Sequence, residues 1–195
     1  MPETIRDGKG RGYLAEVDAD NKLNVRSIAE AVQHYISNEK QNAYQLIGTT
    51  TLSSGTVVSV HIKNTSSSRN LVVTYVRHQI LDNSGGTAFP NTSNYFRIAL
   101  GRTYSSGGTA ITPVNVFQGS ATAAEVTAYE SNPTLAGTAS EIDRWYTKSE
   151  GDMNAFNKEG AVIVPPNGNI ELSYVGDQGA GTLYSRISFL MKDIL

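Results

Sequence analysis

The sequence Val58-Ser59-Val60-His61-Ile62 alternates apolar and polar residues, and after a polar turn comes the long run LVVTYVRHQI at residues 71–80, in which Val72, Thr74, Val76, His78 and Ile80 would share one face of a strand. Alternation with a period of two is typical of a β-strand that buries one face. We therefore predict two strands here, joined as an antiparallel hairpin. The same pairing would allow His61 and His78, one on each strand, to meet across the hairpin.

Further strands are predicted at residues 95–100, 161–164, 170–175 and 183–191, where the same alternation or a short apolar run returns. The sequence Pro165-Pro166-Asn167-Gly168 predicts a tight turn, because proline fixes φ and Asn-Gly tolerates positive φ. Seven or eight short strands separated by turns predict an all-β fold, a jelly-roll-like β-sandwich.

The strand pattern is interrupted by a long loop-rich excursion at about residues 101–160, which is rich in Gly, Ala, Thr and Ser. A short helical segment is predicted within it at residues 140–146. An excursion of this length in a compact domain is usually a functional or interface segment.

The N-terminal part differs from the rest, and we predict a division into an arm with a helix at residues 1–47 and a sandwich domain at residues 48–195. Residues 1–12 are basic and glycine-rich, which predicts an extended arm that a partner must hold in place. Apolar residues at 13–17 and 23–25 flank a polar turn and predict either a β-hairpin or two linear contacts.

One helix is predicted over residues 27–44. Ser27 and Glu30 fit a capping box, and the following apolar residues recur at helical spacing. Two packing partners remain open for this helix, its own domain and a neighbouring subunit.

The composition excludes several classes of protein. A net charge of −2 and a pI near 5.9 argue against nucleic-acid binding, which needs a basic surface. No apolar run is long enough for a transmembrane helix, and the absence of cysteine excludes disulfides and cysteine-bound zinc. The charged fraction is only 17%, and surfaces of this kind are often covered in an assembly.

No catalytic constellation is evident. The three histidines, His34, His61 and His78, form no metal-binding motif, and no serine lies in a nucleophile-elbow sequence. Four clustered acids could in principle catalyse glycoside hydrolysis. They are Glu141, Asp143, Glu150 and Asp152. Acids clustered in a polar loop more often lie on a solvated surface. We predict a protein that is not an enzyme, with no catalytic residue, no metal and no cofactor.

Several short motifs along the chain resemble a group of tailed-bacteriophage virion proteins. The matching motifs are DGKGRGYLAEVD at residues 7–18, LNVRS at 23–27, Asn42-Ala43-Tyr44, Thr112-Pro113-Val114-Asn115 with Gly119-Ser120, and VPPNG at 164–168. The resemblance implies a capsid decoration or cement protein that is made in the cytoplasm of the bacterial host and ends in the virion. It implies the major capsid protein as the partner and a homo-oligomer, with a trimer favoured.

The residues expected to make these contacts fall into two groups. Capsid attachment is predicted for Arg6, Lys9, Arg11, Tyr13, Leu14 and Val17. A subunit interface is predicted for Trp145, Tyr146 and Phe156, with an ordinary core as the alternative for these aromatic residues. A neck, collar or tail accessory protein, and a carbohydrate-binding host-recognition module that uses residues 101–160, remain as alternative functions.

Overall fold

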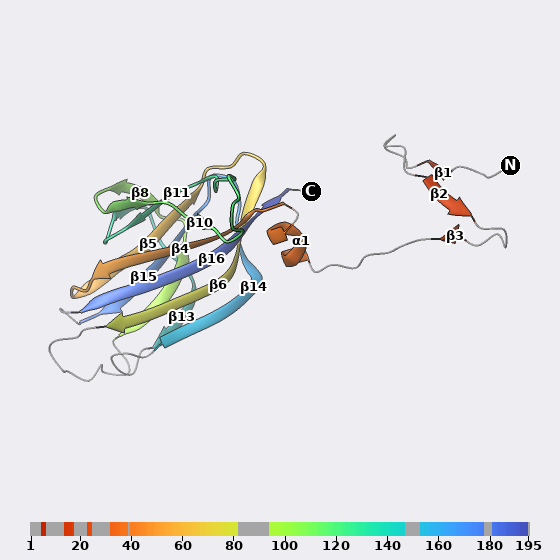
Figure 1. Ribbon diagram of the computed structural model, residues 1–195. Coiled ribbons are helices and arrows are strands. Elements are labelled where there is room, and N and C mark those ends of the chain that lie inside the picture. The colour runs from red at the N-terminus through yellow and green to blue at the C-terminus, as the bar shows by residue number, and fades with distance from the viewer. Residues whose placement is uncertain are drawn as a thin grey trace. The chain divides into compact units, whose positions relative to one another are not determined.

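The computed structural model describes residues 32–38, 40–81, 94–146, 153–177 and 181–194, together with three short strands before them. The chain forms two compact units, Met1–Ala31 and Val32–Leu195 (Figure 1). This division lies N-terminal to the boundary predicted between residues 47 and 48, which falls inside strand β4 (Ala43–Thr51).

The first unit contains a small antiparallel sheet in the order β1-β2-β3. Its strands are β1 (Ile5–Arg6), β2 (Leu14–Val17) and β3 (Leu23–Asn24). Val17 pairs with Leu23 in register, so the predicted hairpin between residues 13–17 and 23–25 is confirmed. A sheet this small needs a further packing surface to be stable in water.

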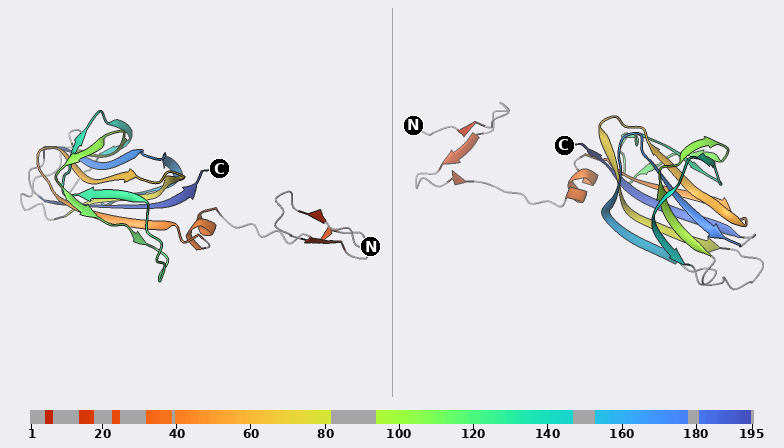
Figure 2. Two further views of the ribbon diagram at one scale, coloured as in Figure 1. Left: turned by 90° about the horizontal axis from the view of Figure 1, so that it is seen from above. Right: turned by 180° about the vertical axis from the view of Figure 1, so that it is seen from behind.

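The second unit is a sandwich of two antiparallel sheets, built mainly from eight strands (Figures 1 and 2). These strands are β4 (Ala43–Thr51), β5 (Gly55–Asn64), β6 (Arg69–Leu81), β7 (Tyr95–Leu100), β13 (Ser140–Tyr146), β14 (Met153–Val164), β15 (Asn169–Gly176) and β16 (Thr182–Asp193). One sheet has the order β10-β4-β16-β6-β14, and the other has the order β13-β7-β15-β5-β11-β9.

The pairing of the eight strands is that of a jelly roll. The first strand pairs with the last, β4 with β16, and the second with the seventh, β5 with β15. The third pairs with the sixth, β6 with β14, and the two middle strands, β7 and β13, pair with each other. The predicted all-β, jelly-roll-like sandwich with one short helix is therefore confirmed.

The interval 101–160 contains five additional short strands before β13. They are β8 (Thr103–Ser106), β9 (Thr109–Ile111), β10 (Val114–Asn115), β11 (Val126–Glu130) and β12 (Thr134–Ala136). β10 extends the first sheet, β9 and β11 extend the second, and β8 and β12 form a separate two-stranded ribbon. The helix predicted at residues 140–146 is wrong, because β13 pairs along β7 and places Trp145 opposite Phe96 in the core.

The predicted hairpin between residues 58–62 and 71–80 is also wrong. Both segments are strands, but β5 belongs to one sheet and β6 to the other. The turn between them crosses the edge of the sandwich, where Asn64 Nδ2 donates to Arg69 O at 2.8 Å and to Val164 O at 3.0 Å. Asn64 thereby ties the crossing turn to β14, in the sheet that β6 enters.

The helix α1 (Val32–Asn38) lies within the range predicted at 27–44, whose first residues lie outside the described part of the chain. Its C-terminal boundary was predicted too late, since Ala43 and Tyr44 begin β4. Ile36 packs against Ala43, Val72 and Leu190, so the helix covers one end of its own domain. Of the two packing partners left open, the helix therefore uses its own domain.

The main core fills the space between the two sheets. Its largest fully buried side chains include Tyr44, Leu46, Ile62, Leu71, Phe96, Ile98, Leu172, Tyr174 and Phe189. Several polar groups within it are hydrogen-bonded to one another. Tyr174, for example, donates from its hydroxyl to Asn94 Oδ1 at 2.5 Å.

Candidate protein-binding surface

The six predicted attachment residues fall in the first unit. Arg6 lies in β1, and Leu14 and Val17 lie in β2, with Arg6 and Leu14 paired in register. Lys9, Arg11 and Tyr13 lie outside the described residues. The backbone therefore brings Arg6 and Leu14 side by side.

The three aromatic residues predicted at a subunit interface occupy different environments. Trp145 is only 9% exposed and packs in the core, with ring centroids 4.5 Å from Phe156 and 6.3 Å from Phe96. Phe156 is partly buried against the same core, whereas Tyr146 is 47% exposed beside Tyr95. Trp145 thus belongs to the chain's own core, the alternative kept open for it, and only Tyr146 offers a large surface.

A different apolar surface, which the sequence did not single out, lies at β10. Val114 is 70% exposed, Val116 55% and Phe117 36%. We call these three residues the β10 patch. A shallow depression of about 220 Å³ beside it is lined by Val116 and Phe117 together with Ser37 and Asn38 of α1. Clustered exposed apolar side chains are typical of protein-binding surfaces.

Asn115, in the middle of the β10 patch, fixes the conformation of this segment. Its Nδ2 donates to Gln41 O at 2.7 Å, to Thr122 O at 3.1 Å and to Ser120 Oγ at 3.2 Å. Its Oδ1 accepts from the backbone N–H of Phe117 at 2.9 Å, and Val116 N donates to Ala43 O at 3.0 Å. The patch is therefore rigid before any partner arrives, which reduces the entropy lost on binding.

A buried carboxylate, Glu171, binds two arginines under the β8–β12 ribbon. Arg102 donates from Nε to Glu171 Oε2 and from Nη2 to Oε1, both at 2.6 Å, and Arg97 Nη2 donates to Oε1 at 3.1 Å. Arg102 directly precedes β8, where the Tyr104 ring stacks on Tyr129 with centroids 3.7 Å apart. The cluster therefore fastens the ribbon to the sheet and leaves no free carboxylate there.

A serine and a histidine are in contact inside the core, as they are in the active sites of serine hydrolases. His78 Nδ1 lies 2.7 Å from Ser185 Oγ, and Ser185 Oγ donates to Ser59 Oγ at 2.6 Å. Ser59 Oγ in turn donates to Leu172 O at 3.0 Å. This order makes His78 Nδ1 the donor to Ser185, whereas a catalytic histidine accepts the serine proton.

Burial also sets His78 apart from an active-site histidine. Its ring stacks on Phe96 with centroids 4.8 Å apart, and desolvation lowers its pKa from 6.5 to about 3. His61 lies in the other sheet, with Nε2 3.1 Å from Arg102 O, and burial lowers its pKa too. The predicted meeting of His61 and His78 is wrong, because their strands belong to different sheets.

Two of the four acids considered for glycoside hydrolysis form ion pairs. Glu141 is paired with Arg144, and Asp143 is paired with Lys158. Glu150 and Asp152 lie outside the described residues. Within the described part of the chain, no three histidine, cysteine or acidic residues gather where they could hold a metal ion.

We compared the chain with protein families, curated proteins and solved structures. None of the three comparisons gave a match. Among the described residues, no helix has the length and hydropathy that a membrane span requires.

Proposed function

We propose that this chain is a structural protein of a phage particle, which binds the outside of the capsid as a decoration or cement protein. The observation that carries the proposal is the β10 patch, a rigid apolar surface without ionisable side chains. Such a surface supports protein binding rather than chemistry. Val114 of the patch belongs to one of the motifs that resemble virion proteins, Thr112-Pro113-Val114-Asn115 with Gly119-Ser120, and Val116 and Phe117 lie between its two parts.

In this proposal the two units act together. The N-terminal residues, with Arg6, Leu14 and Val17 among them, attach to the major capsid protein, and the jelly roll rests on the shell or on a neighbouring copy. Two linked contacts bind far more tightly than either alone, because the second becomes intramolecular. A trimer around a local symmetry axis would multiply the effect.

Deletion of residues 1–26 is the direct test of attachment. The shortened protein is expected to keep its thermal midpoint, because the second unit begins at Val32, and to lose at least about tenfold in affinity for undecorated heads. The measurement is co-sedimentation with purified heads, with isolated tails as the parallel target. Undiminished binding to heads would contradict the arm's role, and binding to tails alone would move the protein to the neck or tail.

The β10 patch gives a second prediction. Replacing both Val116 and Phe117 by serine is expected to weaken head binding roughly tenfold, because apolar contacts at the centre of an interface dominate its energy. Ile163→Ser, at an exposed position on β14, is the matched control and should leave binding unchanged. Equal binding by all three proteins in the co-sedimentation assay would exclude the patch as a contact.

The carbohydrate-binding alternative receives less support from the geometry. Trp145, the only tryptophan, lies within residues 101–160, and its side chain is buried in the core. Carbohydrate platforms need an aromatic face that a sugar can reach. No observation in the described part of the chain favours this function over protein binding.

A further inference from the structure

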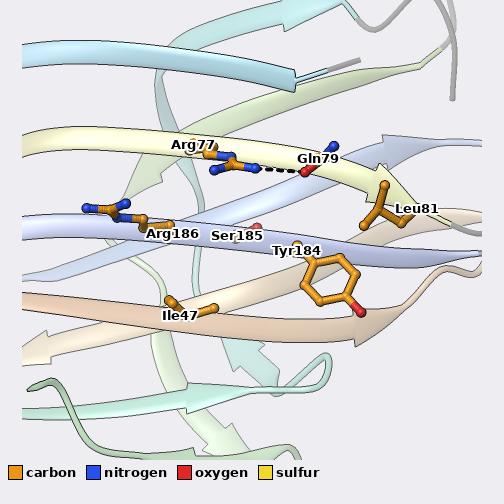
Figure 3. Close-up of a pocket in the computed structure, with 7 residues that line it drawn as sticks. All are labelled: Ile47, Arg77, Gln79, Leu81, Tyr184, Ser185 and Arg186. Carbon is orange, nitrogen blue, oxygen red and sulfur yellow. Dashed lines mark hydrogen bonds between the residues drawn. The ribbon is translucent and has the colours of Figure 1, made fainter. Parts of the chain in front are cut away.

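The outer face of the β10-β4-β16-β6-β14 sheet carries a groove that the proposed function does not use. Helix α1 covers one end of this face, over Val72 and Leu190. Beyond the helix, Figure 3 shows a shallow groove that runs across β4, β16 and β6, with a volume of about 220 Å³. Its lining residues are Ile47, Arg77, Gln79, Leu81, Tyr184, Ser185 and Arg186. We call it the arginine groove.

Two arginines lie at one end of this groove. Arg186 on β16 and Arg77 on β6 are paired directly in register (Figure 3). Like charges opposite each other on neighbouring strands destabilise a sheet. The arrangement therefore carries a cost in the isolated chain that a bound anion would remove.

No described carboxylate neutralises this pair. The other arginines whose side chains are described all pair with acids: Arg69 with Asp193, Arg97 and Arg102 with Glu171, and Arg144 with Glu141. None of the residues that line the groove is acidic. The groove is thus a place of unbalanced positive charge on a chain whose net charge is −2.

The donors of the two arginines are held in position but not fully used. Arg77 Nη2 donates to Gln79 Oε1 at 2.9 Å, and the Arg186 guanidinium lies 5.3 Å from the Tyr75 ring centroid. Arg186 Nε is buried and has no hydrogen-bond partner. Because Nε is buried, a ligand in the groove would meet the terminal nitrogens of the Arg186 guanidinium, and these charged donors suit a carboxylate.

Apolar side chains beside the arginines narrow the choice of ligand. Ile47 lies beside Arg186 on the neighbouring strand β4, whereas Tyr184 and Leu81 lie farther along β16 and β6, and all three are exposed (Figure 3). Strands in a sheet are about 4.8 Å apart, so the groove spans about 10 Å, the width of an extended peptide with its side chains. A small inorganic anion would leave the apolar residues uncovered.

We propose that the arginine groove docks an extended segment of a partner protein in which one carboxylate is flanked by apolar residues. The carboxylate pairs with a guanidinium at the arginine end of the groove, and the apolar residues beside it cover Ile47, Leu81 and Tyr184. Charge complementarity carries this choice of occupant. The proposal does not depend on the partner being a capsid protein.

The test uses the full-length chain and a synthetic peptide, acetyl-Val-Thr-Leu-Glu-Leu-Thr-Val-amide, with a fluorescent label. Binding is measured by anisotropy at low and high salt. The peptide is expected to bind with a dissociation constant below about 1 mM, and the peptide with Gln in place of Glu at least tenfold more weakly. Binding should weaken as the salt concentration rises.

Variants then locate the site. Arg77→Gln and Arg186→Gln are each expected to weaken binding about tenfold, because each removes one charged donor. Arg144→Gln, which removes an exposed arginine from the other sheet, is the matched control. Loss of the Arg186 side chain could also disturb its packing near Tyr75. Ile47→Asp is therefore a second variant: it places a negative charge, which repels the carboxylate of the peptide, at an exposed position of the groove and removes no buried side chain.

Four results would overturn the proposal. They are no peptide binding at about 1 mM, equal affinity for the Glu and Gln peptides, peptide binding that survives all three groove variants, and inorganic phosphate that binds the groove as tightly as the peptide. Self-association of the chain that Arg186→Gln abolishes would also overturn it, because the occupant would then be a second copy.

Discussion

Replacement of Glu171 by glutamine is expected to lower the free energy of unfolding by about 3 kcal/mol, because it leaves two largely buried guanidinium groups without a counter-charge. The side chains of Arg97 and Arg102 are 14% and 18% exposed, and that of Glu171 is 2% exposed. Glutamine keeps the size of the side chain, so the loss reports on charge rather than on a cavity. The measurement is urea unfolding at pH 7.

Glu141→Gln is the matched control for this experiment. Glu141 also accepts two hydrogen bonds from one arginine, Arg144, but the two side chains are 28% and 40% exposed. Solvent screens such a pair, and the expected loss is below about 1 kcal/mol. If both substitutions lower the stability equally, the burial of the Glu171 cluster has no energetic consequence.

Acid is expected to destabilise the jelly roll through His78. In the unfolded chain this histidine binds a proton near pH 6.5, whereas burial lowers its pKa to about 3 in the folded protein. Its contribution to stability is therefore complete above pH 6.5 and is lost as the pH falls toward 3. At about 1.4 kcal/mol per pH unit, the loss reaches about 4 kcal/mol at pH 3. The lowered pKa of His61 acts in the same direction.

The window between pH 5 and 6.5 isolates the histidines, because carboxylates titrate mainly below it. Urea midpoints measured across this window should fall with pH in the natural protein. The His78→Asn variant keeps a side-chain amide that can donate to Ser185 Oγ. We expect this variant to be less stable overall, with a urea midpoint that changes less with pH. Parallel slopes for the two proteins would show that His78 does not control the acid response.

The positions of the strands could largely be predicted from sequence, but their partners could not. Alternation at residues 95–100 gave β7 with both boundaries correct. The alternation at 58–62 identified a strand but not its sheet, since pairing depends on contacts with β15 far along the chain. The turn at Asn64 looks the same in sequence whether it folds back on one sheet or crosses to the other. For Ser140–Tyr146, pairing with β7 outweighed any local helical preference.

The candidate surfaces were harder to predict for the same reason. Val114, Val116 and Phe117 lie in a segment too short to show a period, and their exposure depends on the bonds of Asn115 to Gln41 and Thr122. Arg77 and Arg186 become neighbours only through the register of β6 and β16. Trp145 was predicted at a surface but lies in the core, because the sequence around an isolated aromatic residue does not distinguish a core position from an interface position.

The position of β16 has a consequence for synthesis on the ribosome. β16 lies between β4 and β6, and it is translated after both of them and after β14. Until it emerges, β4 has only the two-residue β10 as a sheet partner, and β6 has only β14. The nascent chain therefore has exposed strand edges in this sheet until β16 is translated, and a ribosome that stalls before residue 182 would leave a product prone to aggregation.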